Sequence, residues 1–296
     1  MAEPFQGTRI HDRHGVCLAL SDSACIPQVG LMGQNKAVRI NKPLRLIQVT
    51  DPHLGENVGY RLSGINTYQS LVSVLESVGE PDMLVVTGDI ACNGQAQAYR
   101  LFDEIMADFK LPHCWLPGNH DAFSVMVRNL ETPYQTRIKL PGWNLLMLNS
   151  TVFNRVNGMV MANELAAVER HLSEDPKTPT LIFSHHPPIE VGCEWLDEQS
   201  IMNAEELFEV LAPFSNVKGI FSGHVHQAAD KQLRTIPAYT TPSTCFQFQS
   251  NLNTFGIADF PPGYRWIDLF PNGHLKTGIE YLENFQQVAD RRCMGY

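Results

Sequence analysis

The amino-acid sequence predicts an α/β fold in which short buried strands alternate with amphipathic helices. From Leu44 onward, short apolar runs alternate with amphipathic stretches, a pattern that matches neither internal repeats nor an all-β barrel. Open α/β sheets place their ligand sites just beyond the carboxyl ends of strands. Polar residues suited to such a site stand at these positions: Asp51, Asp89, Asn119, His185 and His224.

Each element is expected from a local pattern. Strands are expected where apolar residues run together between turn residues, at Leu44–Thr50, Met83–Thr87, His113–Leu116, Asn144–Asn149, Thr180–Ser184 and Val217–Ser222. Helices are expected where apolar residues recur with the period of a helix, at Thr67–Val78, Ala96–Phe109, Glu164–Leu172 and Ala204–Leu211. The rest of the chain becomes β-rich towards Tyr281.

The chain is expected to hold one catalytic domain. Residues 1–40 show no clear hydrophobic periodicity and contain Gly, Pro and Asn residues that are typical of turns. They are therefore treated as an N-terminal extension of undefined structure. Residues 41–285 form the expected domain, and residues 286–296 form a C-terminal tail that is expected to be loose. No linker divides the chain further, and its 44% hydrophobic content over 296 residues is enough for a large core.

Charge and cysteine usage exclude several classes of function. The net charge of -9 argues against a surface that coats nucleic-acid polymers, because such binding needs clustered Lys and Arg. A small anion drawn to bound metals remains possible. The seven cysteines are scattered and odd in number, which favours a reducing, cytoplasmic compartment. No secretory leader and no apolar run long enough to cross a membrane is expected.

Five short motifs supply carboxylate, amide and imidazole groups in order along the chain. They are Asp51-Pro52-His53, Gly88-Asp89, Gly118-Asn119-His120-Asp121, Ser184-His185-His186-Pro187 and Gly223-His224-Val225-His226. Each motif alone is a weak signal, since a strand-end Asp is often a helix N-cap. All five in order, each after an expected strand, indicate one shared site.

The chemistry of these groups predicts a pair of metal ions. Nitrogen and oxygen ligands without thiolate suit manganese, iron, cobalt or zinc, and the candidate ligands outnumber those of one tetrahedral ion. These ligands are Asp51, His53, Asp89, Asn119, His185, His224 and His226. Residues two apart can point from a strand-end turn into one cleft, and the neighbouring glycines let the backbone turn sharply there.

On these motifs, the sequence resembles the calcineurin-like metallophosphoesterase superfamily from about Leu44 to the end of the β-rich segment. The stretches at 115–121, 192–197 and 241–248 make it most similar to the bacterial class III 3′,5′-cyclic-AMP phosphodiesterases. The resemblance implies a four-layer sandwich, in which two β-sheets are flanked by helices. It also implies two divalent ions per chain, with iron or manganese preferred and zinc or cobalt as alternatives.

The resemblance further implies a role for each site residue. One ion would be held by Asp51, His53 and His226 and the other by Asn119, His185 and His224, with Asp89 bridging them. His120 would be no ligand and would instead assist departure of the leaving oxygen. Asn119, His120 and His224 are also expected to bind the substrate.

The expected reaction is hydrolysis of a 3′,5′-cyclic nucleotide, with cyclic AMP preferred, to the 5′-monophosphate by a hydroxide shared between the two ions. The choice between adenine and guanine stays open, as does the oligomeric state. The alternative is another metallophosphoesterase that acts on a different phosphodiester or on a monoester. A binding scaffold without turnover is disfavoured, because all the ligands and His120 are present.

Two features of the site leave alternatives open. Many relatives carry a carboxylate three residues after the bridging Asp, whereas this chain has Cys92, so that Asp121 or a backbone carbonyl would have to orient His120. In the expected lid at 187–203, Trp195 either stacks on the substrate purine or packs the loop or a subunit contact. His186 either orients a ligand or the substrate phosphate, or has a solvent-facing or core role. Arg61, Asn93 and Arg100 are further polar candidates for phosphate or ribose contacts.

Overall fold

The computed structural model describes residues 42–293 and 295. The extension expected at residues 1–40 lies outside the described residues. Every strand expected from the sequence is present, within one residue at each end: β1 (Leu44–Val49), β4 (Met83–Thr87), β5 (His113–Leu116), β7 (Trp143–Leu148), β8 (Thr180–Ser184) and β9 (Val217–Ser222). The β-rich C-terminal part contains four more strands, β10 (Ala229–Leu233), β11 (Ile236–Thr240), β12 (Gly263–Leu269) and β13 (Leu275–Tyr281).

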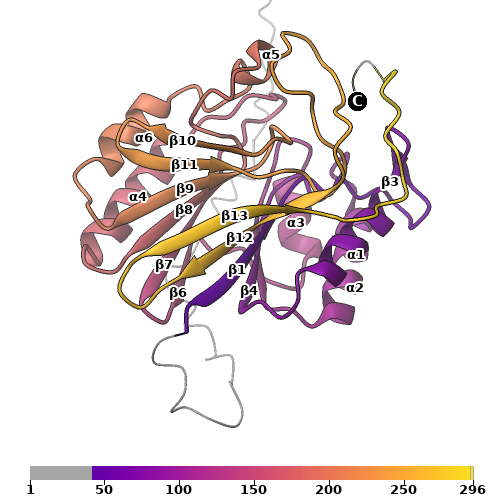
Figure 1. Ribbon diagram of the computed structural model, residues 1–296. Helices are drawn as coiled ribbons and strands as arrows, with labels where there is room; N and C mark the ends of the chain where they lie inside the picture. Colours follow the sequence, from indigo (N-terminus) through magenta and orange to yellow (C-terminus); the bar gives the residue numbers. More distant parts are fainter. Residues whose placement is uncertain (1–41, 294, 296) are drawn as a thin grey trace, which may run out of the picture. The chain divides into compact units, whose positions relative to one another are not determined.

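The strands form two large mixed sheets (Figure 1). The first has the order β13-β12-β1-β4-β5, in which β1, β4 and β5 are parallel and β12 is antiparallel to β1. The second has the order β10-β11-β9-β8-β7-β6, with the edge strand β6 at Arg137–Leu140. A separate short hairpin pairs β2 (Arg61–Leu62) with β3 (Ile65–Asn66).

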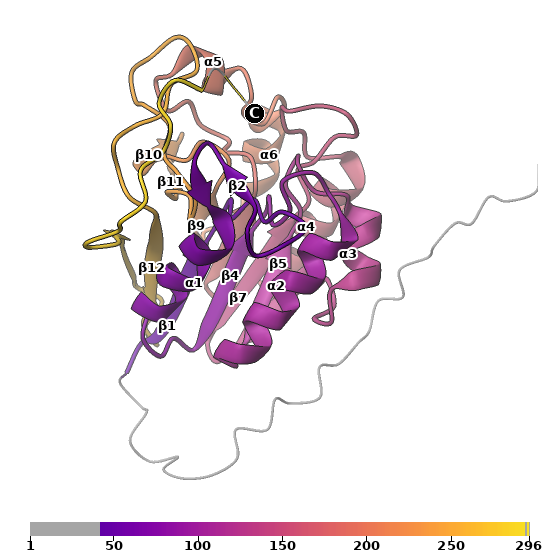
Figure 2. The ribbon, with the colours of Figure 1, turned by 90° about the vertical axis from the view of Figure 1, so that its right-hand side faces the viewer.

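Helices cover the outer face of each sheet, as Figures 1 and 2 show. On the first sheet lie α1 (Thr67–Ser77), α2 (Ala96–Phe109) and α3 (Phe123–Asn129), and on the second lie α4 (Ala162–Glu174) and α6 (Ala204–Leu211). The short helix α5 (Glu194–Asp197) belongs to the long loops at one end of the sheets. The expected four-layer architecture is therefore confirmed.

Three apolar cores hold these layers together. One lies between the two sheets, one between the first sheet and its helices, and one between the second sheet and its helices. Between the two sheets, Leu46 and Val85 of the first pack with Phe183 and Phe221 of the second. Because successive side chains of a strand point to opposite faces, neighbouring strand residues instead pack against the helices. This is why central strands such as β4, β7 and β8 are nearly continuous apolar runs. The third core lies between the second sheet and the helices α4 and α6.

Some elements carry too weak a pattern to be expected from the sequence. The helix α3 has seven residues, α5 has four, and β6 is a four-residue edge strand with one buried side chain. The C-terminal segment is packed rather than loose along part of its length, because Gln287 accepts a hydrogen bond of 2.7 Å from the backbone of Asn66. None of the helices in the described part of the chain has the length and apolar content needed to cross a membrane.

Candidate metal centre

The parallel strands of both sheets end at the same edge, and the five motifs meet there. Backbone hydrogen bonds join the strand-end loops to one another: Asp51 donates to the carbonyl of Gly88 at 3.1 Å, and His53 donates to that of Asp89 at 2.9 Å. In the second sheet, Gly223 donates to the carbonyl of His185 at 2.9 Å. The loops that carry the candidate ligands are therefore fixed as extensions of the sheets.

The backbone at this edge adopts a conformation that side-chain-bearing residues avoid. Five of the seven candidate ligands have positive φ angles, namely Asp51 (53°), His53 (47°), Asp89 (50°), His224 (68°) and His226 (44°). Such angles cost free energy in non-glycine residues, and they persist where the surrounding structure enforces them, commonly at functional sites. The strain lets residues two apart direct both side chains into one cavity.

Glycines lie where the backbone comes close to the candidate ligands and leaves no space for a Cβ atom, as expected for Gly88, Gly118 and Gly223. A Cβ on Gly118 would lie 2.1 Å from the Oδ1 atom of Asp89, and one on Gly223 would lie 1.9 Å from the Oγ1 atom of Thr50. A Cβ on Gly88, whose φ is +94°, would lie 2.5 Å from the Nδ1 atom of His185. Any side chain at these positions would displace a candidate ligand or its support.

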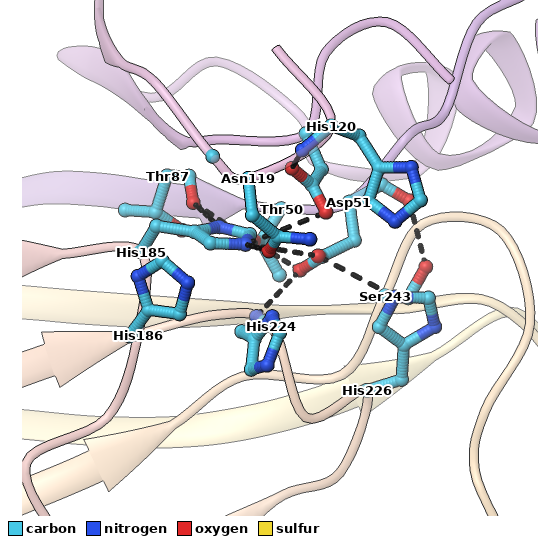
Figure 3. A network of polar contacts seen from close by, with 12 residues as sticks. Thr50, Asp51, Thr87, Asn119, His120, His185, His186, His224, His226 and Ser243 are labelled. Atoms are coloured by element: carbon cyan, nitrogen blue, oxygen red, sulfur yellow. Dashed lines mark hydrogen bonds and ion pairs between the residues drawn. The ribbon is translucent and has the colours of Figure 1, made fainter. Parts of the chain in front are cut away.

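The candidate ligand atoms converge within a few ångströms (Figure 3). The Oδ2 atom of Asp89 lies 3.4 Å from the Nε2 atom of His185 and 3.8 Å from that of His53, which places this carboxylate between two ligand groups. The Oδ1 atom of Asp51 lies 3.4 Å from the Nε2 atom of His226. The Oδ1 atom of Asn119 lies 3.0 Å from the Nε2 atom of His185. All seven expected ligands are thus brought together.

Backbone carbonyls orient two of the imidazole rings. The Nδ1 atom of His185 donates to the carbonyl of Thr87, and that of His226 donates to the carbonyl of Phe246, both at 2.8 Å. A carbonyl can only accept, so Nδ1 carries a proton in each ring and Nε2 faces the cluster. This arrangement is typical of metal-binding histidines, whose second nitrogen is held by an acceptor.

Burial and neighbouring charges shift the pKa values of the ionisable groups in this cluster in different directions. Burial alone would raise the pKa of Asp89, but His185 and His120 hold it well below its usual range. Burial alone would lower the pKa of His185, but Asp89 raises it to about 9. Burial lowers the pKa of His53 to about 3 and that of His224 well below its usual value. His53 and His224 are therefore neutral, the form in which imidazole binds a metal ion.

The residues present fit a cation. Two buried polar atoms of the cluster, Oδ1 of Asp51 and Nε2 of His224, have no hydrogen-bond partner among the described residues. The Nε2 atoms of His53 and His226 face each other at 3.2 Å. Buried lone pairs without a donor cost free energy, and a divalent ion would satisfy them. The donor set of carboxylate, amide and imidazole suits manganese, iron, cobalt or zinc.

His120 stands beside the cluster and is held by the backbone. Its Nδ1 atom donates to the carbonyl of Cys92 at 2.8 Å, and its backbone N–H donates to Asp89 Oδ1 at 2.8 Å. Of the two substitutes for the missing carboxylate, the orienting group is therefore a backbone carbonyl. The Cys92 side chain instead accepts a hydrogen bond of 3.2 Å from the hydroxyl of Tyr60.

Asp121 supports the loops rather than His120. Its carboxylate accepts hydrogen bonds from the backbone N–H groups of Ala91 and Gly118 at 3.0 and 2.9 Å, and one from the hydroxyl of Tyr99 at 3.1 Å. Burial, reinforced by the charge of Asp89, raises the pKa of Asp121 to about 6. Asp121 thus joins the loop after β4 to the loop after β5.

His186 also has a supporting role. Its Nδ1 atom lies 2.8 Å from the hydroxyl oxygen of Ser150, and its Nε2 atom donates to the carbonyl of Val156 at 3.0 Å. Its ring packs edge-on against that of His185, with centroids 4.9 Å apart. His186 is fully buried, and its two ring nitrogens contact the loop at 150–158, so the structure favours a core role, in which the residue packs the ligand His185 against that loop.

A cavity of about 570 Å³ opens beside the cluster and is lined in part by Asn119, His120 and Trp195. The rest of its lining consists of residues that the sequence did not indicate: Asn154, Arg155, Val156, Asn157, Glu198 and Gln199. Trp195 packs against Phe248, with ring centroids 4.9 Å apart, which agrees with its expected role in packing the loop, and it also borders the cavity. Stacking of Trp195 on a purine stays a prediction. Arg61, Asn93 and Arg100 do not line this cavity. No sequence pattern marks the missed residues, which lie in irregular loops.

Fold and cluster together define a two-sheet protein with a candidate metal centre at the strand ends. The chain belongs to the calcineurin-like phosphoesterase family, whose model matches residues 44–228. A 3′,5′-cyclic adenosine monophosphate phosphodiesterase (CpdA) of Escherichia coli is 36% identical over 261 residues, which cover 86% of this chain and 95% of the relative. A 3′,5′-cyclic-nucleotide phosphodiesterase of Nostoc is 35% identical, covering 80% of this chain and 92% of the relative.

A solved structure supports the fold. A dimetal phosphatase of Danio rerio superposes with a TM-score of 0.53 at 15% identity, over 79% of this chain and 98% of the other. At this identity, the likeness concerns the fold alone. The expected membership in the metallophosphoesterases is confirmed.

Proposed function

We propose that this protein hydrolyses 3′,5′-cyclic AMP to the 5′-monophosphate. The observation that carries the proposal is the convergence of seven nitrogen and oxygen donors, with His120 beside them, in one buried cluster. Relatives with 36% and 35% identity are named as cyclic-nucleotide phosphodiesterases, which supports the same reaction here. A phosphodiester anion repels hydroxide, so its hydrolysis requires concentrated positive charge.

The cluster would hold two divalent ions, with iron or manganese preferred. When bound, such ions neutralise phosphate charge and lower the pKa of water. We assign Asp51, His53 and His226 to one ion and Asn119, His185 and His224 to the other. Asp89 would bridge them, in keeping with its carboxylate oxygen 3.4 Å from His185 and 3.8 Å from His53. Asn119 and His224 would also border the substrate phosphate.

His120 would act on the leaving oxygen. Its Nδ1 atom donates to the carbonyl of Cys92, so proton exchange with the substrate would take place at its Nε2 atom. Opening the cyclic phosphate releases the 3′ oxygen, a poor leaving group as an alkoxide. Proton donation to such a group contributes about 10²- to 10⁴-fold in rate.

We also propose that the protein works in a reducing, cytoplasmic compartment. The cysteines in the described part of the chain are free, which supports this location: Cys92, Cys114, Cys193, Cys245 and Cys293. The small cyclic nucleotide would be the partner, without a nucleic-acid polymer, in keeping with the net charge of -9.

A substrate panel tests the proposed reaction. Purified protein loaded with Mn²⁺, Fe²⁺ or Zn²⁺ would be given cyclic AMP, cyclic GMP, 4-nitrophenyl phosphate and bis(4-nitrophenyl) phosphate. We expect cyclic AMP to be converted to 5′-AMP with a higher kcat/KM than the monoester. A strong preference for the monoester, or no turnover of either cyclic nucleotide, would refute the proposal.

A further inference from the structure

The cavity beside the metal centre has a polar lining that the metal chemistry does not use. Two segments build it outside the ligand motifs: the loop at 150–158, which brings Asn154, Arg155 and Asn157, and the segment that starts with α5, which brings Glu198 and Gln199. Its volume of about 570 Å³ lies within the range of small-molecule sites. A nucleoside attached to a phosphate at Asn119 and His120 would extend into this space.

The two segments are fixed to each other and to the metal centre. Gly158 donates a backbone hydrogen bond to Ser200 at 3.2 Å and accepts one from Met202 at 2.9 Å. A Cβ on Gly158 would lie 2.5 Å from the Cγ atom of His186, so the loop backbone rests directly on that ring. His186 in turn packs against the ligand His185. The cavity therefore has a defined position relative to the reacting phosphate.

Its charged groups are available for a ligand. Neither Arg155 nor Glu198 has an ion pair or a side-chain hydrogen bond with any other residue in the described part of the chain, and both are exposed at the cavity wall. Asn154 and Asn157 likewise use no side-chain atom in a hydrogen bond within residues 42–293. The amide of Gln199 donates to the carbonyl of Trp195 at 3.0 Å, which leaves its oxygen to accept.

These groups match the edges of both purines. Guanine presents two acceptors, O6 and N7, which suit the fork of an arginine, and two donors, N1–H and N2–H, which suit a carboxylate. Adenine presents a donor next to an acceptor, which suits the amide of Asn or Gln. Arg155 and Glu198 complement guanine, whereas the three amides of Asn154, Asn157 and Gln199 complement adenine.

Resting on the proposed function, we infer that this cavity binds the nucleoside and that Arg155 and Glu198 allow it to accept guanine. The protein would then hydrolyse cyclic GMP as well as cyclic AMP. Arg155 would contact the O6 and N7 edge, and Glu198 would contact the N1–H and N2–H edge. The amide residues would serve adenine, so that base selectivity is set outside the metal centre.

Steady-state kinetics of single variants test this assignment. Wild type, Arg155→Ala and Glu198→Gln would each be measured with cyclic GMP, cyclic AMP and bis(4-nitrophenyl) phosphate, which has no base. We expect kcat/KM for cyclic GMP to fall about tenfold or more in each variant, mainly through KM, because a bidentate base contact discriminates by this order. With cyclic AMP the change should stay below about threefold, and with the chromogenic diester both variants should match wild type.

Matched variants outside the cavity provide controls. Arg128→Ala and Glu169→Gln remove the same charges at exposed helical positions and should leave all three substrates unchanged. Equal losses on both cyclic nucleotides, unchanged activity on cyclic GMP, or a wild type that hydrolyses only cyclic AMP would each overturn the assignment while leaving the proposed function intact. A wild type that hydrolyses the chromogenic diester but neither cyclic nucleotide would overturn both.

Discussion

The metal centre and the neighbouring cavity are built in different ways. Ligands such as Asp51, His53 and His226 are 0% exposed, follow directly after strands and sit in backbone conformations that the sheets enforce. Arg155 and Glu198 lie on exposed loop segments that are tied to the centre through His186. Rigid strand ends hold the candidate ligands, which need accurate geometry, and the loops hold the groups that we infer to select the substrate. Substitutions in one region should therefore affect rate, and those in the other should affect selectivity.

The two sheets also contribute different donors. The first sheet supplies the oxygen donors through Asp51, Asp89 and Asn119, whereas the second supplies only imidazoles, through His185, His224 and His226. The cluster is thus complete only when the sheets pack face to face. Packing between them, through residues such as Phe183 and Phe221, is consequently a condition for metal binding.

The largest expected effect is in the metal centre, at the proposed bridging carboxylate. Asp89→Ala should reduce turnover of every substrate by at least about 10³-fold, because it removes the oxygen between the two ligand groups. Metal analysis of the purified variant should show fewer than two ions per chain. Near-normal activity with two ions bound would refute the bridging role.

Next in size is the loss of the proposed proton donor. His120→Ala should lower kcat by about 10²-fold or more with little change in metal content, since His120 is assigned no ligand role. Metal stoichiometry and kcat, measured on the same sample, distinguish a proton donor from a metal ligand. Loss of a metal ion from this variant would mean that His120 is a ligand.

A smaller effect is expected where the two regions meet. Gly158→Ala would place a Cβ 2.5 Å from the His186 ring, and overpacking of this kind costs about 1–3 kcal/mol in the free energy of unfolding. Chemical denaturation measures that loss. The loop should shift, so KM for cyclic AMP should rise several-fold while KM for bis(4-nitrophenyl) phosphate changes less. Equal changes for both substrates would show that the loop does not contact the nucleoside.

The smallest effect is expected at Cys92. Cys92→Ala keeps the backbone carbonyl that holds His120, so kcat should remain within about threefold of wild type. The hydrogen bond from Tyr60 to the thiol would be lost, at a cost of about 1 kcal/mol in stability. A fall in kcat of about 10²-fold would instead assign the thiol a part in catalysis.

The sequence by itself determined the strands, the longer helices and the candidate ligands. Apolar runs such as Met83–Thr87 are so regular that strand boundaries follow from them, and the boundaries of α2 also match the expectation. The ligands were recognisable because strand ends put them in predictable places, with glycine beside them. Local patterns suffice where residues close in sequence determine the geometry.

Only the tertiary structure decided what orients His120, where His186 points and which side chains line the cavity. The carbonyl of Cys92 exists in any chain, so no residue type marks its role. The loop at 150–158 and the segment after α5 become neighbours through hydrogen bonds between backbone atoms, such as that from Gly158 to Ser200. Backbone contacts between distant segments depend on how the layers pack, and they leave no periodic trace in the sequence.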